Sequence, residues 1–184
     1  VFKQTGIIRA NNLEEMLNFA SIFEKSIKPK GNKVQIITNG GGYGILSVDA
    51  VANSKNLRLA ELGKDSMTSL KLKFPDIVTV GNPMDLVGDA TTRRYRIAMH
   101  YCVEDKNVDI ILLIALYQTP LLSTDIVDII TEFNDYKKKP IIVVSTGGEF
   151  TDVLRTALNK NGVVTFTFPE EAVRAIDALT GYYV

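Results

Sequence analysis

The sequence predicts a single α/β domain, doubly wound around a mostly parallel sheet. Short apolar, β-branched segments alternate along the chain with segments of helical spacing. This alternation is typical of a parallel sheet covered by helices on both faces. The segment 109–116 is apolar after its first residue, as expected of a strand that is buried on both sides. At 184 residues the chain is long enough to build one substantial hydrophobic core.

The first half of the chain opens with a capped helix. Asn12 can cap this helix, because Glu15 follows three residues later. Its apolar positions recur at helical spacing: Leu13, Met16, Leu17, Ala20 and Phe23. The other expected elements are a short edge strand at 6–8, a strand at 34–38, a helix at 45–53, an outer strand at 57–61 and a helix at 64–71.

The second half continues the alternation. The helix after Thr91 carries one apolar face, made by Tyr95, Ala98, Met99 and Cys102. Ser123 or Thr124 can cap the next helix, whose apolar positions are Ile126, Ile129, Ile130 and Phe133. Strands are expected at 109–116, 141–144 and 163–168, with a helix to about residue 159 before the last of them. The final helix begins at Pro169, a residue favoured at the first helical position, and is expected to end before Gly181.

The glycine-rich turn at 39–44 is the main candidate for function. It follows the apolar strand 34–38, contains four glycines and leads into a helix. Such a turn directs unpaired backbone N–H groups and the positive end of the helix dipole at one point, which suits an anion and most often phosphate. The candidate ligands are therefore the backbone groups of this turn: Asn39, Gly40, Gly41, Gly42, Tyr43 and Gly44.

Three strand-to-helix loops should share one edge of the sheet. Because parallel strands end at the same edge, the loops 39–44, 117–120 and 145–149 are expected together, at the usual ligand position of doubly wound folds. The loop 82–91 enters a helix and is expected to reach the same edge. The secondary candidate residues in these loops are Asn82, Asp85, Thr91 and Gln118.

Composition excludes several broad classes of function. Lysine plus arginine equal aspartate plus glutamate at 21 each, so no basic field indicates nucleic acid or an anionic membrane. The only basic run, 137–139, sits at an expected helix end, where it serves the helix dipole and solvation. A single cysteine, Cys102, allows no internal disulfide. With no signal pattern and no apolar run long enough to cross a bilayer, a cytoplasmic location is expected.

Several specific chemistries also fit poorly. Glu61 lies about where a ribose-binding acid would stand, but a dinucleotide fingerprint needs a third glycine where Ile45 stands. Neither a P-loop nor a nucleophile elbow is present. His100 is the only histidine, so a multi-histidine metal site is excluded, and Asp85 and Asp89 are expected to make turn and cap hydrogen bonds rather than to bind a cation. No metal site and no catalytic residue is therefore assigned within the chain.

The motifs, taken in order, resemble those of one enzyme family. The central motif is Thr38-Asn39-Gly40-Gly41-Gly42-Tyr43-Gly44. It resembles the ligase-type domain of NDP-forming acyl-CoA synthetases, the ADP-forming acetate–CoA ligases related to succinyl-CoA synthetase. Further matching segments follow the family's order and cover nearly the whole chain: 2–9, 47–50, 59–62, 81–91, 107–109 and 168–175.

This resemblance implies a flavodoxin-like domain that works only within a larger enzyme. In the family, acid, CoA and ATP interconvert with acyl-CoA, ADP and phosphate, and a histidine on a mobile loop carries the phosphoryl group to an ATP-grasp domain. Two helix N-termini hold the phosphohistidine, and the matching helix here begins at 42–44. The resemblance implies that residues 1–184 are one domain of a longer chain, with a CoA-binding domain, a histidine-carrying ligase domain and an ATP-grasp partner elsewhere. CoA, ATP or ADP and Mg²⁺ would be used through those other domains.

The chain departs from the family pattern at two places, and two rival functions stay open. Tyr43 stands where the family usually has proline, so it can change the turn or line the acyl pocket. Gln118 is retained at the strand-end loop, although its neighbours differ. The rival functions are a non-catalytic ligand-binding domain of a protein acetyltransferase and a free-standing nucleotide-binding domain. The glycines could also form a tight turn without any ligand.

Overall fold

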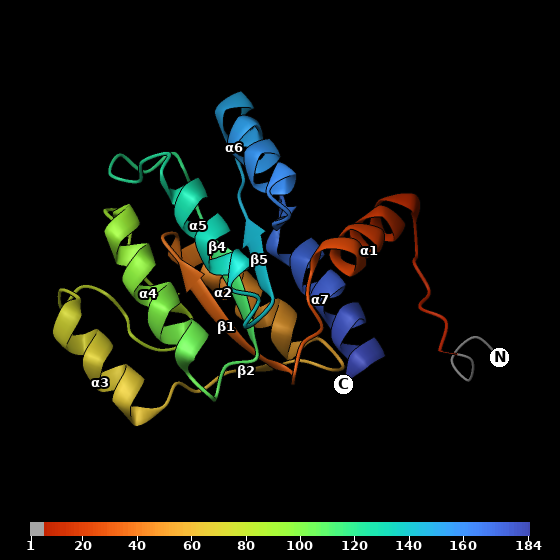
Figure 1. Ribbon diagram of the computed structural model, residues 1–184, viewed down its shortest axis with the longest axis horizontal. Coiled ribbons are helices and arrows are strands. Elements are labelled where there is room, and N and C mark those ends of the chain that lie inside the picture. The colour runs from red at the N-terminus through yellow and green to blue at the C-terminus, as the bar shows by residue number, and fades with distance from the viewer. Residues whose placement is uncertain (1–5) are drawn as a thin grey trace.

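One parallel sheet lies at the centre of the computed structural model, which describes residues 6–184 (Figure 1). The opening residues of the family resemblance, 2–5, lie outside this range. The strands are β1 (Lys33–Thr38), β2 (Arg58–Leu59), β3 (Met84–Asp85), β4 (Ile110–Ile114), β5 (Ile141–Val144) and β6 (Val164–Phe166). Their order is β2-β1-β4-β5-β6, β3 also pairs with β1, and every named pairing is parallel. Without the short β3 this is the flavodoxin-like order, so the predicted fold class is confirmed.

Helices cover both faces of this sheet (Figure 1). They are α1 (Leu13–Lys25), α2 (Gly41–Ala52), α3 (Lys64–Lys73), α4 (Thr92–Glu104), α5 (Ile126–Asp135), α6 (Glu149–Lys160) and α7 (Pro169–Tyr183). The helices α1, α2 and α7 contribute to one apolar cluster, and α3, α4, α5 and α6 contribute to the other. Among residues 6–184 no helix is both long and apolar enough to cross a membrane.

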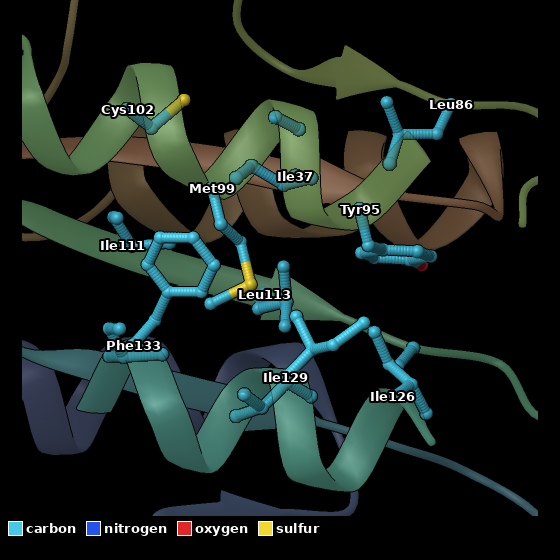
Figure 2. Close-up of a cluster of buried hydrophobic side chains, with 14 of the residues drawn as sticks. Ile37, Leu86, Tyr95, Met99, Cys102, Ile111, Leu113, Ile126, Ile129 and Phe133 are labelled. Carbon is cyan, nitrogen blue, oxygen red and sulfur yellow. The ribbon is translucent and has the colours of Figure 1, made fainter. Parts of the chain in front are cut away.

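The two clusters are separated by the alternation of side chains along the strands. In β4, Ile111 and Leu113 face the cluster under α4 and α5, whereas Ile110, Leu112 and Ile114 face the cluster under α7. All five side chains are fully buried, which explains why this segment reads as a continuous apolar run. Figure 2 shows Ile111 and Leu113 meeting side chains from the facing helices, among them Met99 of α4 and Phe133 of α5. The predicted apolar faces of α4 and α5 are thereby confirmed.

The structure corrects the expected elements near three turns. Residues 6–8 form no strand. The helix α2 begins at Gly41 rather than at residue 45, so three of the four glycines lie inside its first turn. A short strand, β3, was not expected; it forms because residues 84–85 pair with the end of β1 while Asp85 bridges back to Thr79.

Two helix ends also differ from expectation. Neither Ser123 nor Thr124 caps α5, because the N-cap residue is Asp125, which makes no side-chain cap hydrogen bond, and the helix begins at Ile126. Gly181 lies inside α7 instead of after it. The reason for glycine there is contact rather than termination, since a Cβ atom at Gly181 would come within 2.5 Å of the Asn56 amide nitrogen.

The lysine run 137–139 follows α5 in the chain but contacts the C-terminus of α4. Lys139 donates hydrogen bonds to the carbonyl oxygens of Cys102 (3.0 Å) and Asp105, at the end of α4. Lys138 forms an ion pair with Glu104 of the same helix. The expected role at a helix C-terminus is therefore confirmed, but for α4 rather than α5.

Asn82 fills a gap along the edge of β1. This edge pairs with β2 at its start and with β3 at its end. Between them, the Asn82 amide oxygen accepts from the Ile36 N–H (3.1 Å), and its amide nitrogen donates to the carbonyls of Val34 (2.7 Å) and Ala60 (3.0 Å). The side chain thus replaces a missing stretch of sheet, and its polar groups are occupied within the fold. We therefore remove Asn82 from the candidate ligands.

We expect Asn82→Ala to destabilise the chain by about 1–3 kcal/mol, because it leaves the Ile36 N–H of β1 without an acceptor. Asn107→Ala is the matched control, since Asn107 is exposed, and it should change the free energy of unfolding by less than about 0.5 kcal/mol. Urea unfolding of the two variants measures both values. An equal effect of both substitutions would contradict the bridging role of Asn82.

Candidate functional site

The N-terminus of α2 presents free backbone donors at the edge where the parallel strands end. Gly40 is the N-cap residue, no side chain caps the helix, and no acidic residue stands in its first turn. The N–H groups of Gly41, Gly42 and Tyr43 have no acceptor within the helix, because the first intrahelical bond of this turn is from the Gly44 N–H to the Gly40 carbonyl (3.1 Å). Gly41 and Gly42 are exposed. The positive end of the helix dipole is thus open to an anion.

Two buried side chains hold this turn in place. The Thr38 hydroxyl accepts from the Gly40 N–H and lies 2.9 Å from the Gly40 carbonyl, to which it also donates. The Asn39 amide oxygen accepts from the Leu116 N–H (2.9 Å), and its nitrogen donates to the Leu116 carbonyl (3.0 Å) and to the Thr119 hydroxyl (3.0 Å). Asn39 therefore shapes the turn, as predicted, by fixing the end of β1 to the loop after β4.

Three glycines of the turn are closely packed by neighbouring side chains, but Gly42 is not. A Cβ atom at Gly40 would come within 2.5 Å of Leu116, one at Gly41 within 2.8 Å of the Asp85 carboxylate, and one at Gly44 within 3.0 Å of Thr38. At Gly42 a Cβ atom would meet nothing within 4 Å. Glycine at an exposed helical position costs roughly 0.5–1 kcal/mol relative to alanine. Contacts within the chain therefore do not explain Gly42.

Tyr43 occupies the third position of α2 in ordinary helical geometry. Its side chain is half-buried against the apolar cluster under α7, and its carbonyl accepts from the Ser47 hydroxyl (2.8 Å). Of the two roles expected for Tyr43, a changed turn is excluded, because the helix continues regularly through it. Its backbone N–H belongs to the exposed donor set.

The loops after β4 and β5 adjoin one another at the same edge. The Gln118 amide nitrogen donates to the Thr146 carbonyl (2.6 Å), and a Cβ atom at Gly147 would come within 2.2 Å of that nitrogen. Gln118 is exposed. The helix α6 then begins after Gly148, again without a side-chain cap. The expected convergence of the three strand-to-helix loops is confirmed.

The remaining secondary candidates make local contacts. The Asp85 carboxylate accepts from the Val87 N–H (2.9 Å) with one oxygen, while the other lies beside Gly41. Thr91 caps α4 through the Arg94 N–H (3.3 Å), and Arg94 pairs with Asp89 at 2.6 Å. Asp85 thus makes the expected turn hydrogen bond, whereas Asp89 forms an ion pair with Arg94 instead of a turn or cap hydrogen bond. Asp85 lies close enough to the start of α2 to influence an anion there, whereas Thr91 serves its own helix.

The sequence did not predict the roles of two side chains that hydrogen-bond to the backbone near the site, Thr38 and Tyr95. Thr38 holds the glycine turn, and its only signal is a hydroxyl residue at the end of an apolar strand. Tyr95 donates from its hydroxyl to the Ile114 carbonyl (2.6 Å) at the end of β4. Complete burial raises the pKa of Tyr95 well above its ordinary value, so the hydroxyl remains a donor at neutral pH. Periodicity places Tyr95 on a buried face but does not reveal the partner of its hydroxyl.

Other reactive groups lie away from the α2 turn. Within the described range 6–184, no group of three or more histidine, cysteine, aspartate or glutamate side chains could hold a metal ion. His100 lies near the end of α4 with its ring edge-on to Tyr101. Burial raises the pKa of the Cys102 thiol far above its ordinary value, which leaves the thiol protonated and unreactive.

These features define a class of protein: a flavodoxin-like α/β domain with an uncapped helix N-terminus at the point where the strand order reverses. Comparison with known proteins gives the family. The Ligase-CoA domain family matches residues 34–182, and the chain belongs to this family.

Curated relatives and solved structures agree with this assignment. The chain is 33% identical to the alpha subunit of acetate–CoA ligase [ADP-forming] II from Pyrococcus furiosus, over 97% of this chain and 39% of that protein. It is also 33% identical to acetate–CoA ligase [ADP-forming] from Methanocaldococcus jannaschii, over 98% of this chain and 26% of that protein. A dinucleotide-forming acetyl-coenzyme A synthetase 1 from Ca. Korarchaeum cryptofilum, solved with phosphate and ADP, superposes with a TM-score of 0.89 at 26% identity, covering 98% of this chain and 39% of that one. The chain therefore spans about a quarter to two fifths of the length of these relatives.

We expect Thr38→Val, which keeps the shape of the side chain, to destabilise the chain by about 1–3 kcal/mol because it leaves the buried Gly40 N–H without an acceptor. Thr68→Val, at an exposed position of α3, is the control and should change stability by at most about 0.5 kcal/mol. Denaturant unfolding compares the two. A Thr38→Val variant as stable as its control would show that the hydroxyl does not hold the turn.

Proposed function

We propose that this chain is one domain of an ADP-forming acyl-CoA synthetase, in which acid, CoA and ATP interconvert with acyl-CoA, ADP and phosphate. Its part is to bind the transferred phosphoryl group at the N-terminus of α2. The named relatives are ADP-forming acid–thiol ligases, which supports a ligase over a regulatory ligand-binding domain. The chain alone is not expected to catalyse the reaction.

The observation that carries this proposal is Gly42. It lies exposed in the first turn of an uncapped helix, and no contact within the chain requires a glycine there. A phosphoryl group that approaches the backbone closely does require one, because any side chain would occupy the space of the oxygens. The N–H groups of Gly41, Gly42 and Tyr43 would then donate to these oxygens.

The Asp85 carboxylate determines the side from which the anion approaches. One of its oxygens lies beside Gly41, where like charge opposes a phosphate. The phosphoryl group is therefore expected on the Gly42 side of the helix end. Gln118, which is exposed in a loop at the same edge of the sheet, remains a candidate to contact the phosphoryl or acyl group.

The phosphoryl carrier must come from outside this chain. His100 is the only histidine of these 184 residues. It lies in the last turns of α4, far from the N-cap residue Thr91, so we do not assign it as the phosphoryl carrier. We propose that a histidine of a second ligase domain brings the phosphoryl group to α2, and that CoA, ATP and Mg²⁺ bind to other domains of the parent enzyme. Residues 1–184 would then act as one domain of that enzyme.

The parent enzyme tests this function directly. Incubation with ATP and Mg²⁺ should give an acid-labile phosphorylated form, seen by intact mass, that discharges when a carboxylic acid and CoA are added. Failure to phosphorylate, with the ATP-grasp partner active, would contradict the ligase assignment and favour the regulatory domain.

Substitutions at Gly42 test the site itself. Gly42→Ala should stabilise the 184-residue chain by up to about 1 kcal/mol through its higher helix propensity. Gly42→Asp should also be tolerated, because an acidic side chain is favourable in the first helical turn. Both variants should nevertheless reduce turnover of the parent enzyme, Gly42→Asp by about 100-fold or more, because its carboxylate puts negative charge and bulk where the phosphoryl oxygens would lie.

Thr68→Asp is the control, since Thr68 is exposed in α3, on the opposite face of the sheet from α2. This substitution adds the same negative charge away from the α2 turn. It should leave the turnover of the parent enzyme within about two-fold of the unsubstituted value. Unchanged turnover in Gly42→Asp would refute the proposed site.

A further inference from the structure

A polar cavity lies at the edge of the sheet where the parallel strands begin, which we call the β1–β2 cavity. Its volume is about 340 Å³, within the range of small-molecule sites in proteins. Its lining comes from the first residue of β1, from β2 and the loop after it, and from the loop before β4: Lys33, Arg58, Leu59, Glu61 and Asn107. Because Thr38, at the other end of β1, leads into α2, roughly 16 Å of strand separates this cavity from the α2 turn.

Two cations form one wall of the β1–β2 cavity. Lys33 and Arg58 are in-register partners of the parallel β1–β2 pair, so their side chains stand on the same face of strands about 4.8 Å apart. Like charges at such neighbouring positions repel each other. Within the described range 6–184, neither side chain forms an ion pair. The fold therefore places two uncompensated positive charges side by side at a cavity.

The aspartates nearest this wall are bonded to the backbone. Asp105 is buried, and its two carboxylate oxygens accept from the N–H groups of Gly63 (2.8 Å) and Asn107 (2.8 Å). Asp109 accepts from the Lys33 backbone N–H at 3.0 Å. These bonds join the loop after β2 to the loop before β4, on the two sides of the cavity. The walls are thus fixed by the fold before any ligand enters.

Glu61 and Asn107 supply a different chemistry to the same cavity. Both are exposed, and Glu61 forms no ion pair within residues 6–184. A carboxylate accepts hydrogen bonds and a carboxamide both donates and accepts them, so the two groups suit hydroxyls of a sugar. A carboxylate binds ribose hydroxyls in this way in dinucleotide sites. The sequence suggested Glu61 for that role beside the glycine turn, but the structure places it with Lys33 and Arg58 instead.

We propose that the β1–β2 cavity binds a small sugar phosphate. Its phosphate lies between Lys33 and Arg58, and its hydroxyl groups contact Glu61 and Asn107. A phosphate monoester carries close to two negative charges at neutral pH, so it balances both cations, whereas a carboxylate balances only one. The guanidinium of Arg58 suits two phosphate oxygens at once, and Lys33 adds a point charge. The same group occurs in free sugar phosphates and in nucleotides.

Calorimetric titration of the 184-residue chain tests this proposal. We expect ribose-5-phosphate to bind about ten-fold or more tightly than either inorganic phosphate or ribose, because each of these makes only half of the contacts. AMP identifies the source of the ligand: binding of AMP supports a nucleotide, and exclusion of AMP with binding of ribose-5-phosphate supports a free sugar phosphate. Inorganic phosphate that binds as tightly as ribose-5-phosphate would refute the proposal, and so would a failure of both phosphate esters to bind.

A pair of matched variants tests the cationic wall. Arg58→Gln should weaken the binding of ribose-5-phosphate by about ten-fold or more, because a charged hydrogen-bond donor is lost. Arg93→Gln is the control, since Arg93 is exposed on α4 and forms no ion pair within residues 6–184. It should leave the affinity within about two-fold. Both variants should keep the thermal midpoint of the chain, and equal affinities in the two would overturn the proposal.

Two further variants locate the ligand. Glu61→Gln should weaken ribose-5-phosphate but not inorganic phosphate, because it removes an acceptor for hydroxyls and also a charge that repels phosphate. Gly42→Asp alters the α2 turn at the other edge of the sheet and should leave the binding of ribose-5-phosphate unchanged. Binding that is lost in Gly42→Asp and kept in Arg58→Gln would place the ligand at α2 and contradict the proposal. None of these titrations involves phosphoryl transfer, so their failure is distinguishable from failure of the proposed function.

Discussion

The candidate site depends on the hydrogen bonds between the Asn39 side chain and the Leu116 backbone, which we call the clasp. The carboxamide of Asn39 bonds to both backbone groups of Leu116, which extends the β1–β4 pairing beyond the last paired residues, Thr38 and Ile114. The chain leaves these two strands in different directions at this point, because the strand order reverses here. Without the clasp, the turn before α2 and the loop that carries Gln118 would be free to separate. A buried amide with its polar groups occupied thus fixes the geometry of exposed donors beside it.

Sequence reasoning predicted the fold well, because its signals are strong. The uninterrupted apolar run of β4 and the periodic face of α4 each require a particular layer, and together they specify the parallel sheet. Local boundaries were less accurate. The start of α2 was placed four residues late, since glycines are poor helix formers and only the fold reveals that Gly41 to Gly44 are helical. Asn82 was a ligand candidate because asparagine is common in loops, but three long-range hydrogen bonds place it within the sheet edge.

The site itself was predicted in part. The glycine turn and its position at the edge of the sheet follow from the sequence, since strand, turn and helix occur in order. The distinction among its glycines does not, because the clashes that require Gly40, Gly41 and Gly44 involve residues distant in the chain, such as Leu116 and Asp85. The same is true of α1, whose apolar stripe is evident in the sequence while the buried Glu15–Arg174 pair that turns part of it outward is not. At α2 the backbone donors that this domain leaves unused are those we assign to the phosphoryl group.

The central claim is that the backbone donors of α2 hold the phosphoryl group, and amide NMR of the parent enzyme tests it most directly. Selective ¹⁵N labelling of glycine and tyrosine would allow the N–H signals of Gly41, Gly42 and Tyr43 to be followed during turnover. The account predicts that these signals move downfield when the enzyme is phosphorylated with ATP and Mg²⁺, and return when acid and CoA discharge the phosphate. Signals that stay unchanged while the enzyme becomes phosphorylated would show that the phosphoryl group is held elsewhere.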